Sequence, residues 1–338
     1  MNKNLINFQK INNRYEEIKG LLVNTPLLQS DEINSLFSSN IFFKAENLQK
    51  TGSFKFRGAC SAISSLNMEQ IKSGVVCFSS GNHAQGIALA AKLHKTTAKI
   101  IMPKDAPKIK IQNTKKYGAK IVFYDRGIDD RESIGEQIAH DENRVLIKPF
   151  DNYDVILGQG TAALQAINNL QEKEKNSQQK FDAAIICTSG GGLAAGSGTV
   201  LKFHNSDCSL YTAEPHNWND HEKSFELKER FTINSQKHGI CDALENPIPG
   251  EITFPINVKN GFRGLSASEN SVRIAMQMIM RNFNFIVEPS GAIGLACLLE
   301  NENLVRDKNV LIILSGGNID RTSSVSYTHL TLPTSVTV

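Results

Sequence analysis

The sequence predicts an α/β fold built from doubly wound parallel sheets. Short apolar runs, often rich in β-branched residues, alternate with longer stretches of helical pattern along most of the chain. Four of these runs end in Ser, Gly or Asn, which leave free backbone N–H groups at the start of the following helix. Strands that are each followed by a helix are typical of βαβ units, in which helices cover both faces of a parallel sheet.

The expected elements follow one another in a regular order. The predicted strands are 73–80, 97–103, 119–125, 181–189 and 309–315. The predicted helices are 81–94, 104–118 and 190–204. Ligands of open α/β sheets gather outside the carboxyl ends of the strands, so we expect the functional residues at these junctions.

Three segments lack a clear period. Residues 170–180 are polar and charged, as at a helix end with an exposed loop, and 224–258 is predicted to be a long irregular excursion. The tail, 324–338, is rich in Thr and Ser and resembles translated sequencing-adapter read-through. We expect this tail to be foreign to the natural gene and without a chemical role.

Composition excludes several classes of function. Of the 338 residues, 40% are hydrophobic and 21% are charged, and the formal net charge is +3. This charge is too small to favour nucleic acid or an anionic membrane, and no apolar stretch is long enough to span a bilayer. The six cysteines are scattered and form no C-x-x-C pair, which predicts buried free thiols in a reducing compartment. No signal-peptide core is present at the N-terminus, so we expect a cytoplasmic protein.

The stretch "KTGSFKFRGA" (50–59) places Lys55 between two phenylalanines, with Arg57 two residues later. One interpretation is a surface strand whose lysine extends into water while Phe54 and Phe56 cover its stem. The other is an amine kept partly neutral by desolvation and by a neighbouring positive charge, so that it can form a Schiff base. The decapeptide alone does not distinguish them.

Glycine-rich turns follow several of the predicted strands. The stretch "CTSGGGLAAG" (187–196) offers successive N–H groups at a helix start, which suits a ligand with one phosphate, although a flexible turn has the same composition. It has neither the Walker A pattern nor the dinucleotide spacing. In "SSGNHAQG" (79–86) the backbone donors suit a carboxylate, Asn82 suits a phenolic oxygen, and His83 adds a titratable ring; the alternative is a capped helix with a solvent-facing histidine.

Two further motifs offer polar ligands. Ser315 in "LSGGN" stands after an apolar strand and is able to contact a heterocyclic nitrogen. In "TAEPHNWND" (212–220), Glu214 and Asp220 are hard oxygen ligands that suit Mg²⁺ or Ca²⁺ together with a backbone carbonyl and waters. Two loop carboxylates are also common as solvated surface groups.

Seven motifs in order resemble the serine/threonine dehydratase family, a group of pyridoxal 5'-phosphate (PLP) enzymes of fold type II that are similar to the tryptophan synthase β subunit. The motifs are "TPLL", "KAENLQKTGSFKFRGA", "SSGNHAQG", "PFDNYDVILGQGT", "SGGGLAAG", "EPSGA" and "LSGGNID", which lie within 25–320. The resemblance implies two doubly wound α/β domains. The large domain would comprise 1–72 and 153–323, with the small domain, 73–152, inserted into it. It also implies a homodimer or homotetramer.

The resemblance implies a role for each matched residue. Lys55 would be the Schiff-base lysine and the proton carrier at the substrate α-carbon, with its hydration limited by Phe54 and Phe56 and its charge disfavoured by Arg57. Ser315 would face the pyridine nitrogen, and its neutral hydroxyl would keep the electron sink weak, which suits β-elimination. The predicted cofactor-binding residues are Phe54, Lys55, Asn82, Ser189, Gly190, Gly191, Gly192, Leu193, Glu288 and Ser315. The predicted substrate-binding residues are Ser79, Ser80, Gly81 and His83.

Different features resemble different branches of the family. Ser80 resembles the residue that acts as a second acid/base in serine racemases. Glu214 and Asp220 match a metal loop of the racemase and hydroxyaspartate branch, in which Trp218, standing in place of a small residue, would supply a backbone carbonyl. In contrast, 240–257 resembles bacterial threonine or serine dehydratases. We expect an L-threonine/L-serine dehydratase acting on a small hydroxy amino acid. The alternatives are a serine racemase, a threo-3-hydroxyaspartate ammonia-lyase, and a non-catalytic α/β protein that binds a phosphate ligand.

Overall fold

The computed structural model describes residues 5–79, 81–106, 108–173, 179–235 and 237–319. Two features of the sequence, Ser80 and the tail 324–338, lie outside these ranges. Within them no helix is long and apolar enough to cross a membrane. All six cysteines are buried and free, as their scatter predicted.

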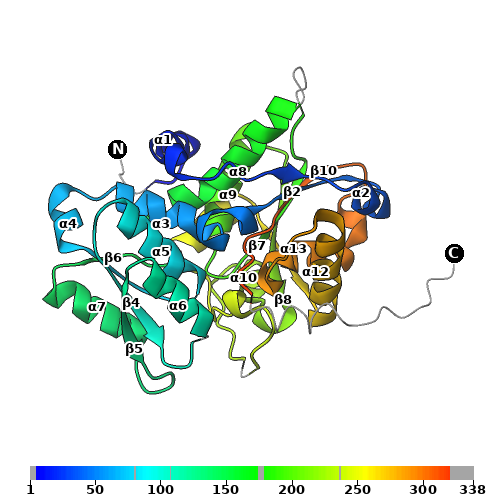
Figure 1. Cartoon of the computed structure of the whole chain (residues 1–338). Coiled ribbons are helices and arrows are strands. Elements are labelled where there is room, and N and C mark those ends of the chain that lie inside the picture. The colour runs from blue at the N-terminus through cyan, green and yellow to red at the C-terminus, as the bar shows by residue number, and fades with distance from the viewer. Residues whose placement is uncertain (1–4, 80, 107, 174–178, 236, 320–338) are drawn as a thin grey trace.

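The strands form two sheets (Figure 1). The six-stranded sheet has the order β1-β2-β10-β7-β8-β9, and all its pairs are parallel except β1 with β2. Its strands are β1 (Leu27–Leu28), β2 (Asn40–Lys44), β7 (Ala183–Cys187), β8 (Ser209–Pro215), β9 (Arg263–Ala267) and β10 (Asn309–Ile313). The four-stranded sheet is parallel throughout, in the order β5-β4-β3-β6. Its strands are β3 (Val75–Phe78), β4 (Ala98–Pro103), β5 (Lys120–Tyr124) and β6 (Val145–Leu146).

Helices connect these strands and cover them. Those associated with the smaller sheet are α4 (Met68–Ser73), α5 (Asn82–Leu93), α6 (Lys108–Lys116) and α7 (Arg131–Asp141). The others are α1 (Phe8–Ile18), α2 (Asp31–Phe37), α3 (Lys55–Ser64), α8 (Tyr153–Lys173), α9 (Gly192–His204), α10 (Asp220–Leu227), α11 (Thr253–Lys259), α12 (Glu269–Phe283) and α13 (Pro289–Leu299). The five predicted strands and three predicted helices are confirmed, whereas α10 and α11 order parts of the segment expected to be irregular.

Alternating residues of β3 show why the smaller sheet is covered on both faces. Val75 and Cys77 pack with residues of α5 in one core, while Val76 and Phe78 pack with residues of α7 in another. Successive side chains of a strand point to opposite faces, so a fully apolar strand needs a helix on each side. The prediction of an α/β fold with parallel sheets is therefore confirmed.

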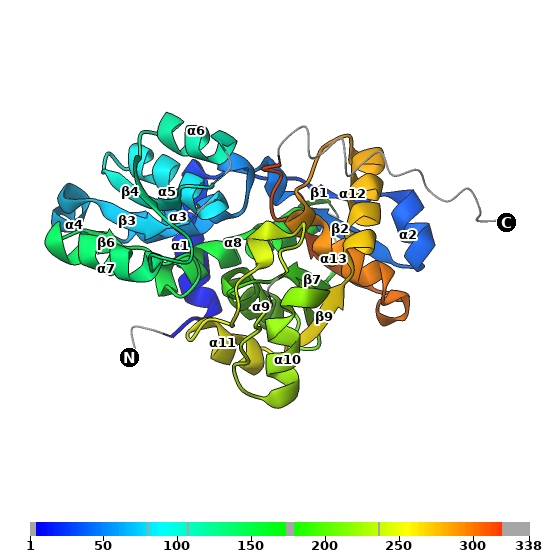
Figure 2. The ribbon, with the colours of Figure 1, turned by 90° about the horizontal axis from the view of Figure 1, so that it is seen from below.

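The two sheets lie in separate lobes of the molecule (Figure 2), joined by packed helices. Helix α3 packs on both α5 and α8, and α8 packs along α9. The four-stranded sheet arises wholly from residues 75–146, and the strands of the larger sheet come from both sides of that range. The expected domain boundaries next to 72 and 153 stay a prediction.

Candidate active site

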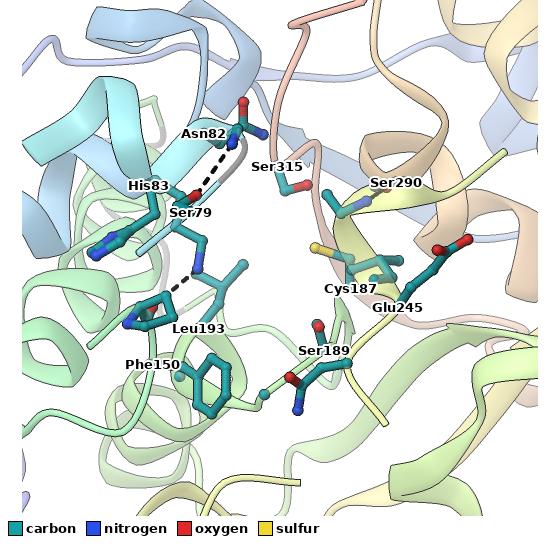
Figure 3. A pocket seen from close by; sticks show the side chains of 18 of the residues that line it. Ser79, Asn82, His83, Phe150, Cys187, Ser189, Leu193, Glu245, Ser290 and Ser315 are labelled. Atoms are coloured by element: carbon teal, nitrogen blue, oxygen red, sulfur yellow. Dashed lines mark hydrogen bonds between the residues drawn. The ribbon is translucent and has the colours of Figure 1, made fainter. Parts of the chain in front are cut away.

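One pocket brings together the glycine-rich turns that follow β3 and β7 (Figure 3). All the predicted cofactor- and substrate-binding residues within the described part of the chain line it: Phe54, Lys55, Ser79, Gly81, Asn82, His83, Ser189, Gly190, Gly191, Gly192, Leu193, Glu288 and Ser315. In Figure 3, Asn82 and His83 lie on one side of the pocket, and Ser189, Cys187 and Ser315 lie on the other. These junctions at strand ends are where an open α/β sheet holds its ligands.

The amine of Lys55 lies inside this pocket. Lys55 is the first residue of α3, and its Nζ donates a hydrogen bond to the Pro149 carbonyl at 3.0 Å and lies 5.2 Å from the centre of the Phe54 ring. Desolvation lowers the pKa of Lys55 to about 8, against a small opposing effect of Cys187. At this pKa about a tenth of the amine is uncharged at pH 7 and about half at pH 8, far more than at the ordinary lysine value, and a nucleophilic lysine requires the uncharged form.

The neighbours of Lys55 in sequence do not act on it as expected. The Phe56 side chain is fully buried, and its ring lies beside Lys50, 5.8 Å from that ammonium. Arg57 is fully buried as well and pairs with Glu46 at 2.6 Å. The expectation that Phe56 and Arg57 tune the lysine is wrong, because successive helical residues point about 100° apart around the helix axis.

The turn between β7 and α9 has the features of a phosphate cradle. Gly191 precedes α9 with φ of 91°, which an L side chain rarely adopts, and a Cβ on Gly190 would lie 2.2 Å from the Phe150 ring. The hydroxyl of Thr253 donates to the Gly190 carbonyl, and Asn257 donates to the Gly191 carbonyl at 3.4 Å. With those carbonyls bound from behind, the first N–H groups of α9 have no partner within the helix and suit an anion.

Asn82, Glu288 and Ser315 lie across the pocket from this turn. The Asn82 amide donates to Glu288 at 2.6 Å and accepts from Asn318 at 2.8 Å, which orients it and leaves one N–H for a ligand. Burial, followed by the charge of Asp242, raises the pKa of Glu288 to about 7. Ser315 follows β10 and lies next to the Cys187 thiol. The side chains present thus fit a ligand with one phosphate, an aldehyde and a ring nitrogen, as PLP has.

His83 is a neutral hydrogen-bonding group rather than a titrating one. Burial and then the charge of Lys55 lower the pKa of His83 to about 3. Its Nε2 lies 3.2 Å from the Ile147 carbonyl, so Nε2 carries the hydrogen, and Nδ1 is left as an acceptor without a partner in the described part of the chain. Ser79, whose Oγ accepts from the Gly81 N–H at 3.2 Å, completes the described part of this loop, and Ser80 lies outside it.

Sequence analysis missed two cations that line the pocket. Lys110 pairs with Asp242 at 2.7 Å, and Arg131, the first residue of α7, lies with its guanidinium carbon 5.5 Å from the centre of the Phe78 ring. Both residues follow strands of the smaller sheet, so their position after a carboxyl strand end was a signal that could have indicated them.

A second polar cluster lies behind the phosphate cradle. Glu214 is the second-last residue of β8, Asp220 begins α10, and both lie next to His221, which sequence analysis did not name. Glu214 accepts backbone N–H groups of His221 and Glu222, each at 2.9 Å, whereas both carboxylate oxygens of Asp220 lack a hydrogen-bond partner among the residues that the structure describes. Buried oxygens without donors fit a cation. Trp218 turns its indole away, donating to the Lys237 carbonyl at 3.0 Å.

Burial and the charges of the neighbouring side chains shift the pKa values of this cluster. Desolvation raises the pKa of Glu214 to about 7 and also raises the pKa of Asp220. Burial alone would lower the pKa of His221, but the two carboxylates outweigh it and raise that pKa to about 9. A proton or a cation among these three side chains therefore offsets the cost of burying the two carboxylates.

Known proteins resemble the chain over most of its length. A family model described as "Pyridoxal-phosphate dependent enzyme" matches residues 18–316. L-threo-3-hydroxyaspartate ammonia-lyase of Pseudomonas sp. is 40% identical over 305 residues, which are 90% of this chain and 93% of that protein. Serine racemase of Schizosaccharomyces pombe is 37% identical over 322 residues, 95% and 97% of the two chains.

Structural similarity is equally extensive. The crystal structure of serine racemase from Dictyostelium discoideum matches with a TM-score of 0.85 and 36% identity, covering 93% of this chain and 99% of that one. That structure shares the α/β architecture of this chain. The chain belongs to the family of pyridoxal-phosphate dependent enzymes, uses PLP as its cofactor, and has the architecture of fold type II.

Proposed function

We propose that the protein is an ammonia-lyase that removes the β-hydroxyl and amino groups of L-serine or L-threonine and leaves a 2-oxo acid. One observation carries the proposal: the Lys55 amine, the glycine turn before α9 and the Ser315 hydroxyl line a single pocket. Bound PLP supplies an electron sink that stabilises negative charge on the α-carbon of an attached amino acid.

Different residues of the pocket are suited to different parts of this reaction. The Lys55 amine, with its pKa lowered to about 8, is suited to hold the cofactor and then to accept the α-proton. The N–H groups at the start of α9 suit the phosphate, and those at the start of α5 suit the substrate carboxylate. Ser315 offers the ring nitrogen a neutral hydroxyl instead of a carboxylate, so the sink stays weak. A weak sink favours prompt loss of the β-hydroxyl over reactions that need long-lived negative charge.

The direct test is an assay of products from each candidate substrate. The proposal expects a 2-oxo acid and ammonia in equal amounts from L-serine or L-threonine. L-threo-3-hydroxyaspartate is assayed beside them, and D-serine formation from L-serine is followed in parallel. Absence of 2-oxo acid from every substrate, or D-serine formed faster than pyruvate, would contradict the proposal; the racemase alternative further requires that Ser80→Ala remove the D-serine.

The pH dependence of cofactor uptake is a further expected result. Uptake of PLP by the apoprotein should accelerate as pH rises through about 8, because only the unprotonated Lys55 amine reacts with the aldehyde. The measurement is the rate of the visible absorbance change after mixing, between about pH 6 and 10. A rate that shows no midpoint near pH 8 and is still rising steeply at about pH 10, toward the ordinary lysine value of 10.5, would show that burial does not lower this pKa.

A dicarboxylic substrate, hydroxyaspartate, is the second candidate, and Arg131 favours it. Arg131 lines the pocket and has no ion pair with a carboxylate among the residues that the structure describes, whereas the other missed cation, Lys110, is neutralised by Asp242. A guanidinium available in a pocket suits a second carboxylate of the substrate. The 40% identical relative from Pseudomonas is named for that substrate.

Arg131→Gln separates the two candidates. If hydroxyaspartate is a substrate, the variant should lose about 10- to 100-fold in kcat/KM for it, since a charge-assisted hydrogen bond contributes about 1.5–3 kcal/mol. Activity on L-serine should change little. Arg126→Gln, which removes an exposed arginine paired with Asp105, is the matched control. Equal losses on both substrates would assign Arg131 to the architecture of the pocket and remove it as a selectivity residue.

A further inference from the structure

The link between β6 and α8, residues 147–152, contacts the pocket at two points. The Pro149 carbonyl accepts the hydrogen bond of the Lys55 amine at 3.0 Å. The Phe150 ring packs on the turn before α9 so closely that a Cβ on Gly190 would lie 2.2 Å from it (Figure 3). The placement of this link therefore affects both the lysine and the phosphate cradle.

The next residue of the link, Asp151, is bound to a segment that lies 100 positions later in the chain. Its carboxylate accepts the backbone N–H groups of residues 251, 252 and 253, at 2.6, 3.1 and 3.4 Å. Hydrogen bonds that a charged acceptor makes to backbone N–H groups are stronger than neutral ones. A Cβ built on Gly250 would lie 2.2 Å from Asp151 Oδ1, so the carboxylate comes this close because a glycine stands there.

The segment 250–253 in turn holds the phosphate cradle. The Thr253 hydroxyl and the Gly250 N–H, the latter at 3.3 Å, both donate to the Gly190 carbonyl. The contacts thus form a closed ring, in which Asp151 binds the segment, the segment binds Gly190, and Gly190 packs against the link. Residues 250–253, all of which the structure describes, are not part of the pocket lining, so they support the site from outside.

We propose that Asp151 is a positioning residue for the cofactor, which acts by fixing the spacing between the phosphate cradle and the Lys55 amine. Its carboxylate acts through Thr253 on the Gly190 carbonyl, and through the chain on Pro149 and its hydrogen bond to the lysine. The phosphate and the aldehyde of PLP belong to one small molecule, so the cradle and the amine hold it well only at a matching distance. The proposal does not depend on which reaction the enzyme performs.

The test is a double-mutant cycle that measures the Kd for PLP by absorbance and not the activity. Asp151→Asn replaces the charge and one acceptor oxygen by an N–H donor of the same shape, and it should raise the Kd by about tenfold or more. Thr253→Val should weaken binding as well. Because both side chains act through the Gly190 carbonyl, the double variant should lie within about twofold of the more affected single variant. The matched control is Asp154→Asn, which removes an ion pair of 3.0 Å with Arg14 and should leave the Kd within about twofold.

A second readout needs no variant, and it decides the matter if Asp151→Asn does not fold. Hydrogen exchange of the wild-type protein should slow at the amides of residues 251–253 when PLP binds, although these residues lie outside the pocket lining. The proposal is overturned if these amides exchange equally with and without PLP, or if folded Asp151→Asn binds PLP within about twofold of the wild type. Effects of the two substitutions that multiply as independent changes, or an equal loss in Asp154→Asn, would overturn it as well.

Discussion

Lys55→Ala is expected to lower the rate of 2-oxo acid formation by at least about 10³-fold, because the substitution removes both the amine that holds PLP and the base at the α-carbon. The loss of activity should be accompanied by loss of the visible absorbance of lysine-bound cofactor. The pocket offers no other amine in the same position: the Nζ of Lys110 is paired with Asp242, 2.7 Å away.

Lys50→Ala is the matched control for this variant. Lys50 lies five positions earlier in the same motif, but its ammonium stands over the Phe56 ring and it does not line the pocket. The control should keep wild-type absorbance and rates within about twofold. Substantial activity in Lys55→Ala, or equal losses in the two variants, would contradict the assignment of Lys55.

Arg57→Met is expected to have the largest effect on stability, a loss of about 3–5 kcal/mol in the free energy of unfolding. Arg57 donates to both oxygens of Glu46, at 2.6 and 2.8 Å, and also to Gln165 at 2.6 Å. Glu46 is fully buried, so removal of its partner leaves a carboxylate that neither water nor another arginine reaches. The measurement is the urea-induced unfolding of the holoenzyme followed by circular dichroism.

Combining Glu46→Gln with Arg57→Met provides the control for this prediction. The double variant no longer buries an unpaired charge, so it should recover most of the stability that the single variant loses. The neutral Gln side chain still accepts the hydrogen bond from Thr25, which now reaches Glu46 at 2.6 Å. A single variant within about 1 kcal/mol of wild type would show that the pair is not the stabilising element of this network.

Local patterns in the sequence were sufficient for the fold class and for the strand ends that form the pocket. The strand at 73–80 and the helix at 81–94 follow from an apolar run and a glycine-rich junction, which are short-range features. In the structure, this strand and this helix are β3 and α5. The antiparallel strand β1 was not predicted, since its two residues carry no period and depend on pairing with β2.

The site was harder to predict where it depends on the direction in which a side chain points or on contacts between residues that are distant in sequence. Arg57 lies two positions after Lys55 in sequence, yet it points into a buried network and not at the pocket. His221 was missed because its neighbours on the Gly191 side come from another part of the chain. Arg131 was missed because the sequence analysis did not predict α7, the helix after β5 that begins at this residue and packs against β3 and β4.

The most direct test of the central claim is to locate the lysine that carries the cofactor. The holoenzyme is reduced with borohydride, digested, and its peptides are mapped by mass spectrometry. The account predicts a phosphopyridoxyl group on Lys55 at close to one per chain. A label on Lys110, Lys50 or any other lysine, or no label on an enzyme that has bound PLP, would contradict it.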